Sequence, residues 1–231
     1  MPTTATISQT VHITTGDGHR LSAYQAGDHE SGVALVLLQE IFGVNRHIRS
    51  VADTYAESGF YVVAPALFDR IQAGVELDAN VSEDVALARG FATRLDVEKT
   101  LQDVAAAVSF ARARTGRDKV GVIGFCLGGI YAWLSSTRLE IDAAVGYYGS
   151  KIVCYRNEKP RCPVILHFGS RDHVISEVDV AEIEQAQPDV PVFRYDAGHA
   201  FNRYGGSNYS PEAATLAWTR SVRFLHETLT A

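Results

Sequence analysis

A cysteine between two glycines is the residue whose type and setting most clearly suggest chemistry. Gly124-Phe125-Cys126-Leu127-Gly128 follows an apolar run and precedes a segment with a helical pattern. The spacing is that of the G-x-S-x-G nucleophile elbow, with cysteine in the central place. Such a turn lifts the side chain above the sheet edge and points it at a helix start, where free N–H groups and the dipole favour thiolate. The pattern predicts a nucleophilic Cys126; a buried structural cysteine at a tight turn is the alternative.

An elbow nucleophile predicts an acid and then a histidine later in the chain. Asp172 follows the apolar run 164–168, and His199 follows the run 192–195. In a Cys126–Asp172–His199 triad, the histidine takes the thiol proton and later protonates the leaving group, while the aspartate orients its ring. For Asp172, a role in a loop turn or as a helix cap is the alternative.

The other titratable residues near these loops fit the triad less well. Asp196 is close to His199 in sequence but lies in the wrong loop for the acid. His167 falls inside a predicted strand and is expected in the core, whereas His173 is either a substrate contact or an exposed loop residue. The remaining histidines fall on segments expected to be solvated: His12, His19, His29, His47 and His226.

The loop at 39–43 is expected to complete the site. Backbone N–H groups must hold the developing oxyanion, and the natural donors are those of Leu127 and Ile41. Glu40 ends an apolar strand and is expected to point toward Cys126, where an uncompensated carboxylate opposes thiolate formation. Glu40 therefore either takes the thiol proton or serves structure, through a salt bridge or as a cap for the helix after Asn45.

Alternating strands and helices from residue 33 onward predict a parallel sheet covered on both faces, in one α/β domain spanning 1–231. An antiparallel hairpin is expected over 6–26, and residues 66–81 have little periodicity and are expected to form a surface excursion. Predicted strands cover 33–38, 60–64, 119–125, 143–148, 164–168 and 192–195. Predicted helices follow Asn45 and cover 82–94, 97–114, 127–137, 176–187 and a final segment from Pro211 through Leu216, Val222, Leu225 and Leu229.

Composition excludes several classes of protein. The 231 residues are 46% hydrophobic with a net charge of −6 and no basic run, which argues against nucleic-acid binding. No apolar run approaches the roughly 18 residues that span a bilayer, and the N-terminus does not resemble a signal peptide. The three cysteines lack metal-ligand spacing, and their odd number argues against a disulfide framework. We therefore expect a cytoplasmic protein without metal, whose oligomeric state the sequence leaves open.

Four motifs together resemble one enzyme family over nearly the whole chain. QEIFGVN at 39–45, GFCLGG at 124–129, AVGYYG at 144–149 and DAGHAF at 196–201 are similar to the dienelactone hydrolases, or carboxymethylenebutenolidases. The resemblance implies an α/β-hydrolase fold, with a mostly parallel sheet of about eight strands and helices on both faces. It also implies opening of a dienelactone to maleylacetate, a step in the breakdown of chlorinated aromatics, without a metal or organic cofactor. For Glu40 it implies a role in activating Cys126 when substrate binds.

The family binds a substrate carboxylate through arginines, and this chain departs from that pattern. Arg203, four residues after His199, matches one of them, although an ordinary solvated charge is the alternative. Glu83 or Val85 lies where the second is expected, so Arg89 or Arg70 would have to replace it. The resemblance thus implies a small carboxylate-bearing ester or lactone as substrate. The alternative is a broader carboxylesterase or thioesterase without dienelactone activity.

Overall fold

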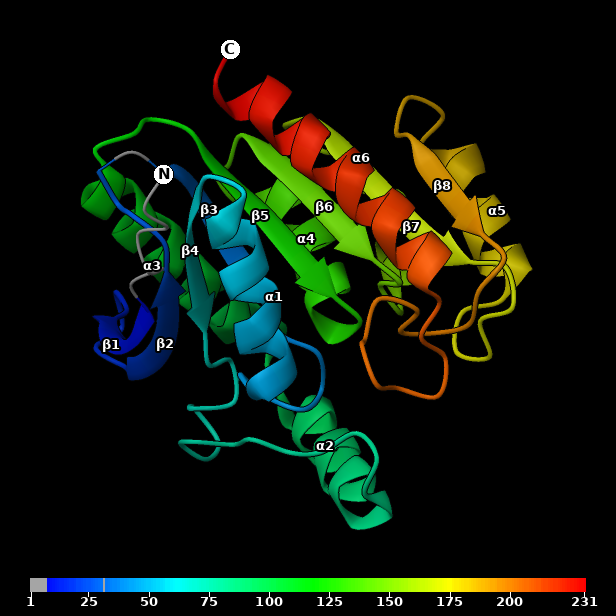
Figure 1. The fold of residues 1–231 in the computed structure, drawn as a ribbon, viewed down its shortest axis with the longest axis horizontal. Coiled ribbons are helices and arrows are strands. Elements are labelled where there is room, and N and C mark those ends of the chain that lie inside the picture. The colour runs from blue at the N-terminus through cyan, green and yellow to red at the C-terminus, as the bar shows by residue number, and fades with distance from the viewer. Residues whose placement is uncertain (1–7, 31) are drawn as a thin grey trace.

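The computed structural model describes residues 8–30 and 32–231, so the first residues of the predicted hairpin lie outside it. Its centre is an eight-stranded sheet in the order β1-β2-β4-β3-β5-β6-β7-β8 (Figure 1). The strands are β1 (Ser8–Thr14), β2 (Arg20–Ala26), β3 (Val33–Leu38), β4 (Phe60–Pro65), β5 (Val120–Phe125), β6 (Ala143–Tyr147), β7 (Val164–Gly169) and β8 (Val192–Tyr195). Pairing is antiparallel for β1–β2 and β2–β4 and parallel elsewhere. This is the predicted α/β-hydrolase sheet.

Helices cover both faces of the sheet. Figure 1 shows α1 and α6 in front of it and α3 and α4 behind it, while α2 projects beyond the lower edge. The α-helices are α1 (Arg46–Glu57), α2 (Ser82–Arg94), α3 (Val97–Thr115), α4 (Leu127–Arg138), α5 (Glu177–Ala186) and α6 (Pro211–Leu229); a short 3₁₀ helix, η1 (Ile152–Tyr155), was not predicted. Among the described residues, none of these helices has the length and apolar character needed to cross a membrane.

Local signals explain why the helices begin where they do. The Asn45 side chain accepts a hydrogen bond from the N–H of Ile48, and Asp96 accepts one from the N–H of Lys99. Both side chains satisfy N–H groups that have no partner inside their helix. At the start of α6, Ser210 occupies the N-cap position without a side-chain hydrogen bond, and Pro211 supplies the fixed backbone angle of the first turn.

The expectation that residues 66–81 lie on the surface is wrong in part. Residues 66–81 do not form a purely surface excursion, because Leu67 and Phe68 are fully buried. The N–H of Leu67 donates to the side chain of Gln39, and Phe68 stacks on Phe91 of α2, so the segment is fastened to the sheet edge. On α6, Leu216 is exposed, whereas Leu225 and Leu229 are buried.

Candidate active site

The site forms where the strand order changes direction. The chain adds β4 on one side of β3 and then β5 on the other, so the loops after β3 and β5 leave the sheet in opposite directions and open a crevice between them. Leu38 pairs with Gly124 at the carboxyl ends of these strands. Glu40 and Cys126 therefore emerge from neighbouring strands at the same edge.

Cys126 occupies a strained turn that only small neighbours permit. Its backbone φ of 53° lies in the left-handed region that non-glycine residues rarely adopt. A Cβ on Gly124 would lie 1.9 Å from the carbonyl oxygen of Gly128, and one on Gly128 would lie 2.2 Å from the carbonyl oxygen of Leu38. The two glycines of the motif are thus required by close backbone packing. The turn is held by a 3.0 Å hydrogen bond from the N–H of Cys126 to the carbonyl of Tyr147.

His199 lies between the thiol and a buried carboxylate. Its Nε2 is 3.2 Å from Sγ of Cys126, and its Nδ1 is 2.7 Å from Oδ2 of Asp172. Asp172 also accepts hydrogen bonds from the N–H groups of Val174 and Ile175, which fix its orientation. The structure therefore brings together the three side chains that the sequence analysis paired.

The loops carrying Asp172 and His199 leave adjacent strands and remain joined. Gly169 at the end of β7 pairs with Tyr195 at the end of β8. Beyond the sheet, the N–H of Ser170 donates to the carbonyl of Tyr195, and the N–H of Arg171 donates to the carbonyl of Ala197. These bonds extend the ladder past the strands and set the distance between the acid and the histidine.

The surroundings of His199 favour its charged form. Burial by itself lowers its pKa, but the hydrogen bonds to Asp172 and Cys126 and the charges of both partners outweigh it and raise the pKa to about 10. For Asp172, burial raises the pKa, and the hydrogen bond and charge of His199 more than reverse that effect, so the pKa is lowered. The contacts of His199 with Asp172 and Cys126 therefore stabilise its imidazolium form.

Glu40 is buried beside this group and is neutralised by an arginine. Its Oε2 is 3.1 Å from Nη1 of Arg203, and its Oε1 accepts a hydrogen bond of 3.3 Å from the hydroxyl of Tyr148. The Arg203 guanidinium also lies 5.2 Å from the centre of the Phe42 ring. The salt bridge, which the sequence left as one alternative for Glu40, is thus present, with a residue expected to bind substrate as its partner.

The structure does not bring a second arginine to Arg203 from the expected positions. Arg70 is held by Asp103 and Asp17 in a network of hydrogen bonds and ion pairs. Arg89 is exposed on α2 and is not among the described residues that line the hollow containing Arg203. Arg70 is therefore committed elsewhere, and substrate binding by Arg89 stays a prediction.

The two expected oxyanion donors lie at the start of α4 and in the loop after β3. Leu127 is the first residue of α4, so its N–H has no acceptor within the helix. Ile41 lies in the loop directly after Glu40, beside the end of β5. Their positions agree with the expected role, which stays a prediction.

Three further titratable residues lie near Cys126, Asp172 and His199 in the fold without joining them. Asp196 is exposed and pairs with Arg171, and His173 is exposed with its ring centre 6.2 Å from that of His199. His167 is in the core as expected, bonded to Tyr195 and Ser221.

Four of the five histidines expected on solvated segments are half-buried: His19, His29, His47 and His226. His226 lies against the Phe60 ring and its Nε2 is 2.9 Å from the carbonyl of Ser58. His47 packs near Glu40 and Arg203; burial lowers its pKa, the Glu40 charge opposes this and the Arg203 charge adds to it. The helical pattern predicted the segments, but not the neighbours that cover His47 and His226.

Sequence reasoning missed Tyr148 and Asn208. Tyr148 follows β6 with a left-handed φ of 36°, contacts His199 edge-on and bonds to Glu40. Burial and the nearby charge of Glu40 raise its pKa well above the ordinary value, so its hydroxyl stays a donor. Asn208 donates to the carbonyl of His199 at 3.0 Å. The sequence could have indicated Tyr148, because it directly follows a predicted strand at the same sheet edge as Cys126. No feature of the sequence indicated Asn208.

The fold and this constellation define an α/β-hydrolase. No group of three or more histidine, cysteine, aspartate or glutamate side chains in the described part of the chain is arranged to hold a metal ion. The model of the dienelactone hydrolase family matches residues 21–229. The chain is 31% identical to carboxymethylenebutenolidase 1 of Cupriavidus pinatubonensis, covering 95% of this chain and 97% of that protein, and 32% identical to the carboxymethylenebutenolidase of Pseudomonas putida, covering 95% and 96%.

Solved structures agree with this similarity. A candidate dienelactone hydrolase from Klebsiella pneumoniae superposes with a TM-score of 0.86 at 26% identity, covering 96% of this chain and 99% of that one. The chain therefore belongs to the dienelactone hydrolase family and is a carboxylic ester hydrolase.

Proposed function

We propose that this chain opens a lactone, or cleaves a small carboxylate-bearing ester, through a Cys126–His199–Asp172 triad. The observation that carries the proposal is the continuous contact from thiol to imidazole to carboxylate, at 3.2 Å and 2.7 Å. Nucleophile and base within hydrogen-bond reach, with the base oriented by a third group, are the arrangement needed for covalent catalysis. A cytoplasmic location and a role in aromatic degradation stay predictions.

The reaction follows from the positions of these groups. Sγ of Cys126, as thiolate, attacks the substrate carbonyl carbon, and the N–H groups of Leu127 and Ile41 hold the oxyanion. When the tetrahedral species collapses, the C–O bond breaks and His199 protonates the departing oxygen. Water then attacks the thioester with His199 as base, and this releases the acid and returns Cys126 and His199 to their starting protonation states.

The Glu40–Arg203 ion pair allows a carboxylate-bearing substrate to change the charge environment of Cys126. A substrate carboxylate that binds Arg203 competes with Glu40 for the same guanidinium, whose Nε has no partner among the described residues. Release from Arg203 leaves Glu40 as a less compensated carboxylate, which accepts the thiol proton while His199 keeps its own proton for the leaving group. Glu40 returns that proton to Sγ when the thioester is hydrolysed. Arg203 would thus bind substrate and also control when Glu40 activates Cys126.

A broader carboxylesterase or thioesterase is the second candidate, favoured by one observation. Arg70 is committed to Asp17 and Asp103, and Arg89 does not line the hollow with Arg203. Arg203 is already paired to Glu40, so we expect the site to prefer carboxylate-bearing esters over neutral esters only weakly.

The test compares hydrolysis of a dienelactone with that of a neutral aryl ester, by the wild type and by Cys126→Ala. We expect turnover of the dienelactone at the higher kcat/KM, and loss of both activities in Cys126→Ala with folding retained. Turnover of the aryl ester alone would select the second candidate. Activity retained by Cys126→Ala would refute the triad.

A further inference from the structure

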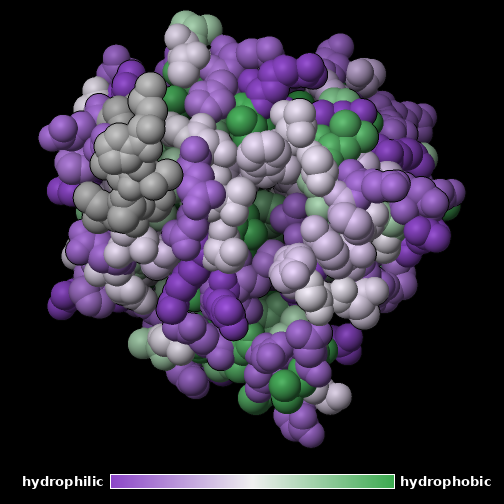
Figure 2. Space-filling view, viewed as in Figure 1, coloured by the Kyte–Doolittle hydropathy of each residue, from purple (hydrophilic) through white to green (hydrophobic). Residues whose placement is uncertain are grey.

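A second cavity, whose lining does not include Cys126, lies between α1, the 202–209 loop and α6. Its volume is about 350 Å³, within the usual range for small-molecule sites. Figure 2, drawn from the same side as Figure 1, shows this face hollowed between the positions of α1 and α6. The lining residues are His47, Ser50, Val51, Thr54, Tyr55, Asn202, Tyr204, Tyr209, Ala214, Thr215 and Trp218. We call this space the α1–α6 cavity.

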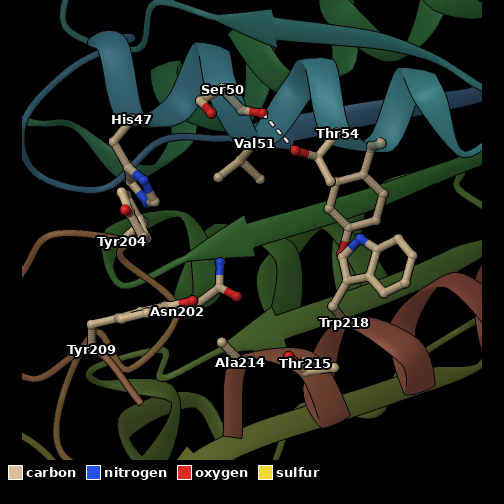
Figure 3. Close-up of a pocket in the computed structure, with 11 residues that line it drawn as sticks. His47, Ser50, Val51, Thr54, Asn202, Tyr204, Tyr209, Ala214, Thr215 and Trp218 are labelled. Atoms are coloured by element: carbon tan, nitrogen blue, oxygen red, sulfur yellow. Dashed lines mark hydrogen bonds between the residues drawn. The ribbon is translucent and has the colours of Figure 1, made fainter. Parts of the chain in front are cut away.

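The walls of the α1–α6 cavity combine aromatic rings with polar side-chain groups. Figure 3 shows His47 extending from α1 toward Tyr204, Asn202 near the centre, and Trp218 rising from α6 on the opposite side. Tyr204 is 83% exposed, and its ring meets that of Tyr209 edge-on with the centres 5.4 Å apart. Flat rings on several sides suit a planar ligand, because stacked and edge-on ring contacts are both favourable.

Three side chains that line the cavity carry a buried polar atom without a hydrogen-bond partner. Nε1 of Trp218, Nε2 of His47 and the hydroxyl of Tyr55 are inaccessible to solvent and make no hydrogen bond within the described residues. Leaving a buried donor unsatisfied costs about 1–3 kcal/mol, so such atoms ordinarily find an acceptor. The indole N–H can only donate, so a ligand that satisfies it must carry an oxygen or nitrogen acceptor, and the side chains that cover the N–H must shift for the ligand to reach it.

The walls are uncharged, which limits the ligand further. None of the described residues that line the cavity is an aspartate, glutamate, lysine or arginine. Burial lowers the pKa of His47, so its ring is neutral near pH 7. A charged ligand would lose its hydration there without gaining an ion pair.

The cavity borders the reacting groups through one loop. Asn202, Tyr204 and Tyr209 belong to the same segment as His199 and Arg203, and Asn208 clamps the carbonyl of His199. The neighbouring hollow that contains Arg203 also shares His47, Ser50 and Tyr204 with the cavity. A ligand in the cavity would therefore contact the loop that carries the histidine of the triad.

We propose that the α1–α6 cavity binds a small, uncharged aromatic molecule that carries an oxygen acceptor, of which phenol is the simplest. Such a ring has two sources: the leaving group of an aryl ester hydrolysed at Cys126, or a free molecule that binds from solution. The binding itself does not depend on the proposed function, because Cys126→Ala removes turnover and leaves the cavity intact.

The two tryptophans of the chain provide a direct measurement. Trp218 lines the cavity, whereas Trp133 is fully buried with its indole N–H bonded to the carbonyl of Tyr155. Phenol titrated into nitrogen-15-labelled Cys126→Ala should shift the Trp218 indole signal saturably and leave that of Trp133 unchanged. Cyclohexanol, of similar size but without a ring face, should bind more weakly. Absence of a saturable shift at Trp218, or equal shifts at both tryptophans, would overturn the proposal.

Variants test the geometry of the site. Trp218→Phe keeps an aromatic wall and removes the donor, so phenol should bind about twofold to tenfold more weakly, with the shift then followed on Tyr209. Ala214→Phe fills the cavity and should abolish binding while the Trp133 signal reports an intact fold. Ser109→Ala, on α3 behind the sheet, is the matched control and should bind like the parent. Binding that persists unchanged in Ala214→Phe would contradict the assignment.

Steady-state kinetics of the wild type distinguish the two sources. If the cavity receives the leaving group, phenol should raise the KM for phenyl acetate and leave kcat and the hydrolysis of ethyl acetate unchanged. If the ligand binds as a separate molecule, phenol should change kcat for both esters. Either result supports the site, and no effect on either ester, together with no shift of the Trp218 signal, rejects it.

Discussion

At the scale of single residues, the proposed chemistry depends on which charges face one another. The Asp172 carboxylate touches His199, which touches Cys126, while Glu40 is compensated by Arg203 on the other side. Separating these charges into two pairs keeps one carboxylate for orienting the histidine. It leaves the other available for exchange with substrate.

Asp172→Asn should lower the pKa of His199, because the hydrogen bond and the charge of Asp172 help to raise it to about 10. His199 must be protonated to release the leaving group, so the alkaline limb of the rate profile should move to lower pH. We also expect kcat to fall about 100-fold or more, the usual scale of acid–base catalysis. Rate profiles of both proteins between pH 5 and 11 test this, and an unmoved alkaline limb would contradict the role of Asp172.

Arg203→Gln should separate carboxylate-bearing from neutral substrates. A charge-assisted hydrogen bond contributes about 1.5–3 kcal/mol, so kcat/KM for a carboxylate-bearing ester should fall about tenfold to 100-fold. For a neutral ester of the same alcohol the change should be much smaller. Arg89→Gln, from the exposed face of α2, is the matched control and decides whether that arginine contributes to binding. Equal losses for both esters in Arg203→Gln would exclude carboxylate recognition.

At the scale of elements, the strand-to-helix turn between β5 and α4 demands close backbone approach. Gly124 and Gly128 pack against carbonyl oxygens at distances that no Cβ tolerates, and this lets the left-handed Cys126 stand at the end of the helix axis. The glycines at 124 and 128 therefore serve the geometry of the turn, and through it the position of the thiol.

Gly128→Ala and Gly90→Ala form a matched pair of helix substitutions. A Cβ at Gly128 meets the carbonyl oxygen of Leu38 at 2.2 Å, whereas one at Gly90 in α2 meets nothing within 4 Å. We expect Gly128→Ala to lower the Tm and the activity together. Gly90→Ala should increase the free energy of unfolding by about 0.5–1 kcal/mol through helix propensity alone. Thermal and urea unfolding of both variants check this, and a fully stable, active Gly128→Ala would show that the turn has more room than the structure indicates.

At the scale of the whole molecule, a buried polar network joins the sheet to α6. His167 of β7 contacts the hydroxyls of Tyr195 and Ser221, and Ser221 lies 2.8 Å from the hydroxyl of Tyr147. Arg220 donates to the same Tyr195 hydroxyl. The network connects β6, β7 and β8 to α6. Tyr148, Asp172 and His199 follow these three strands in that order.

His167 should contribute to the pH dependence of stability, because it takes up one proton when the protein unfolds. Burial, and to a smaller degree the charge of Arg220, lowers its pKa from 6.5 to about 3. Between these values the unfolded chain binds a proton that the folded protein does not, so stability increases with pH across this window and is lost as pH falls. In His167→Gln, the slope of the unfolding free energy against pH should be smaller by about 1.4 kcal/mol per pH unit. Urea unfolding from pH 4 to 6.5 measures it, with exposed His12→Gln as control; an unchanged slope in His167→Gln would show that His167 titrates normally.

The sequence by itself determined the local elements and the three side chains of the proposed triad. Apolar runs, Asn45 and Asp96 as caps, and the glycines around Cys126 act over a few residues, and the structure follows them. Loops that leave parallel strands must meet at one sheet edge, so the order Cys126, Asp172, His199 was sufficient to predict which residues come together.

Only the tertiary structure decided the partners of the long side chains. Glu40 pairs with Arg203 across 163 positions of sequence and Arg70 with Asp103 across 33, and burial of His47 depends on neighbours from separate elements. The same holds for Tyr148, whose contact with Glu40 joins positions 108 apart. Such pairings depend on how loops and helices pack against one another. A flexible side chain can reach several partners with little difference in free energy, so its sequence neighbours do not specify which one it contacts. Local pattern therefore specified the backbone and the position of the proposed nucleophile, while packing specified which charges meet and where cavities remain.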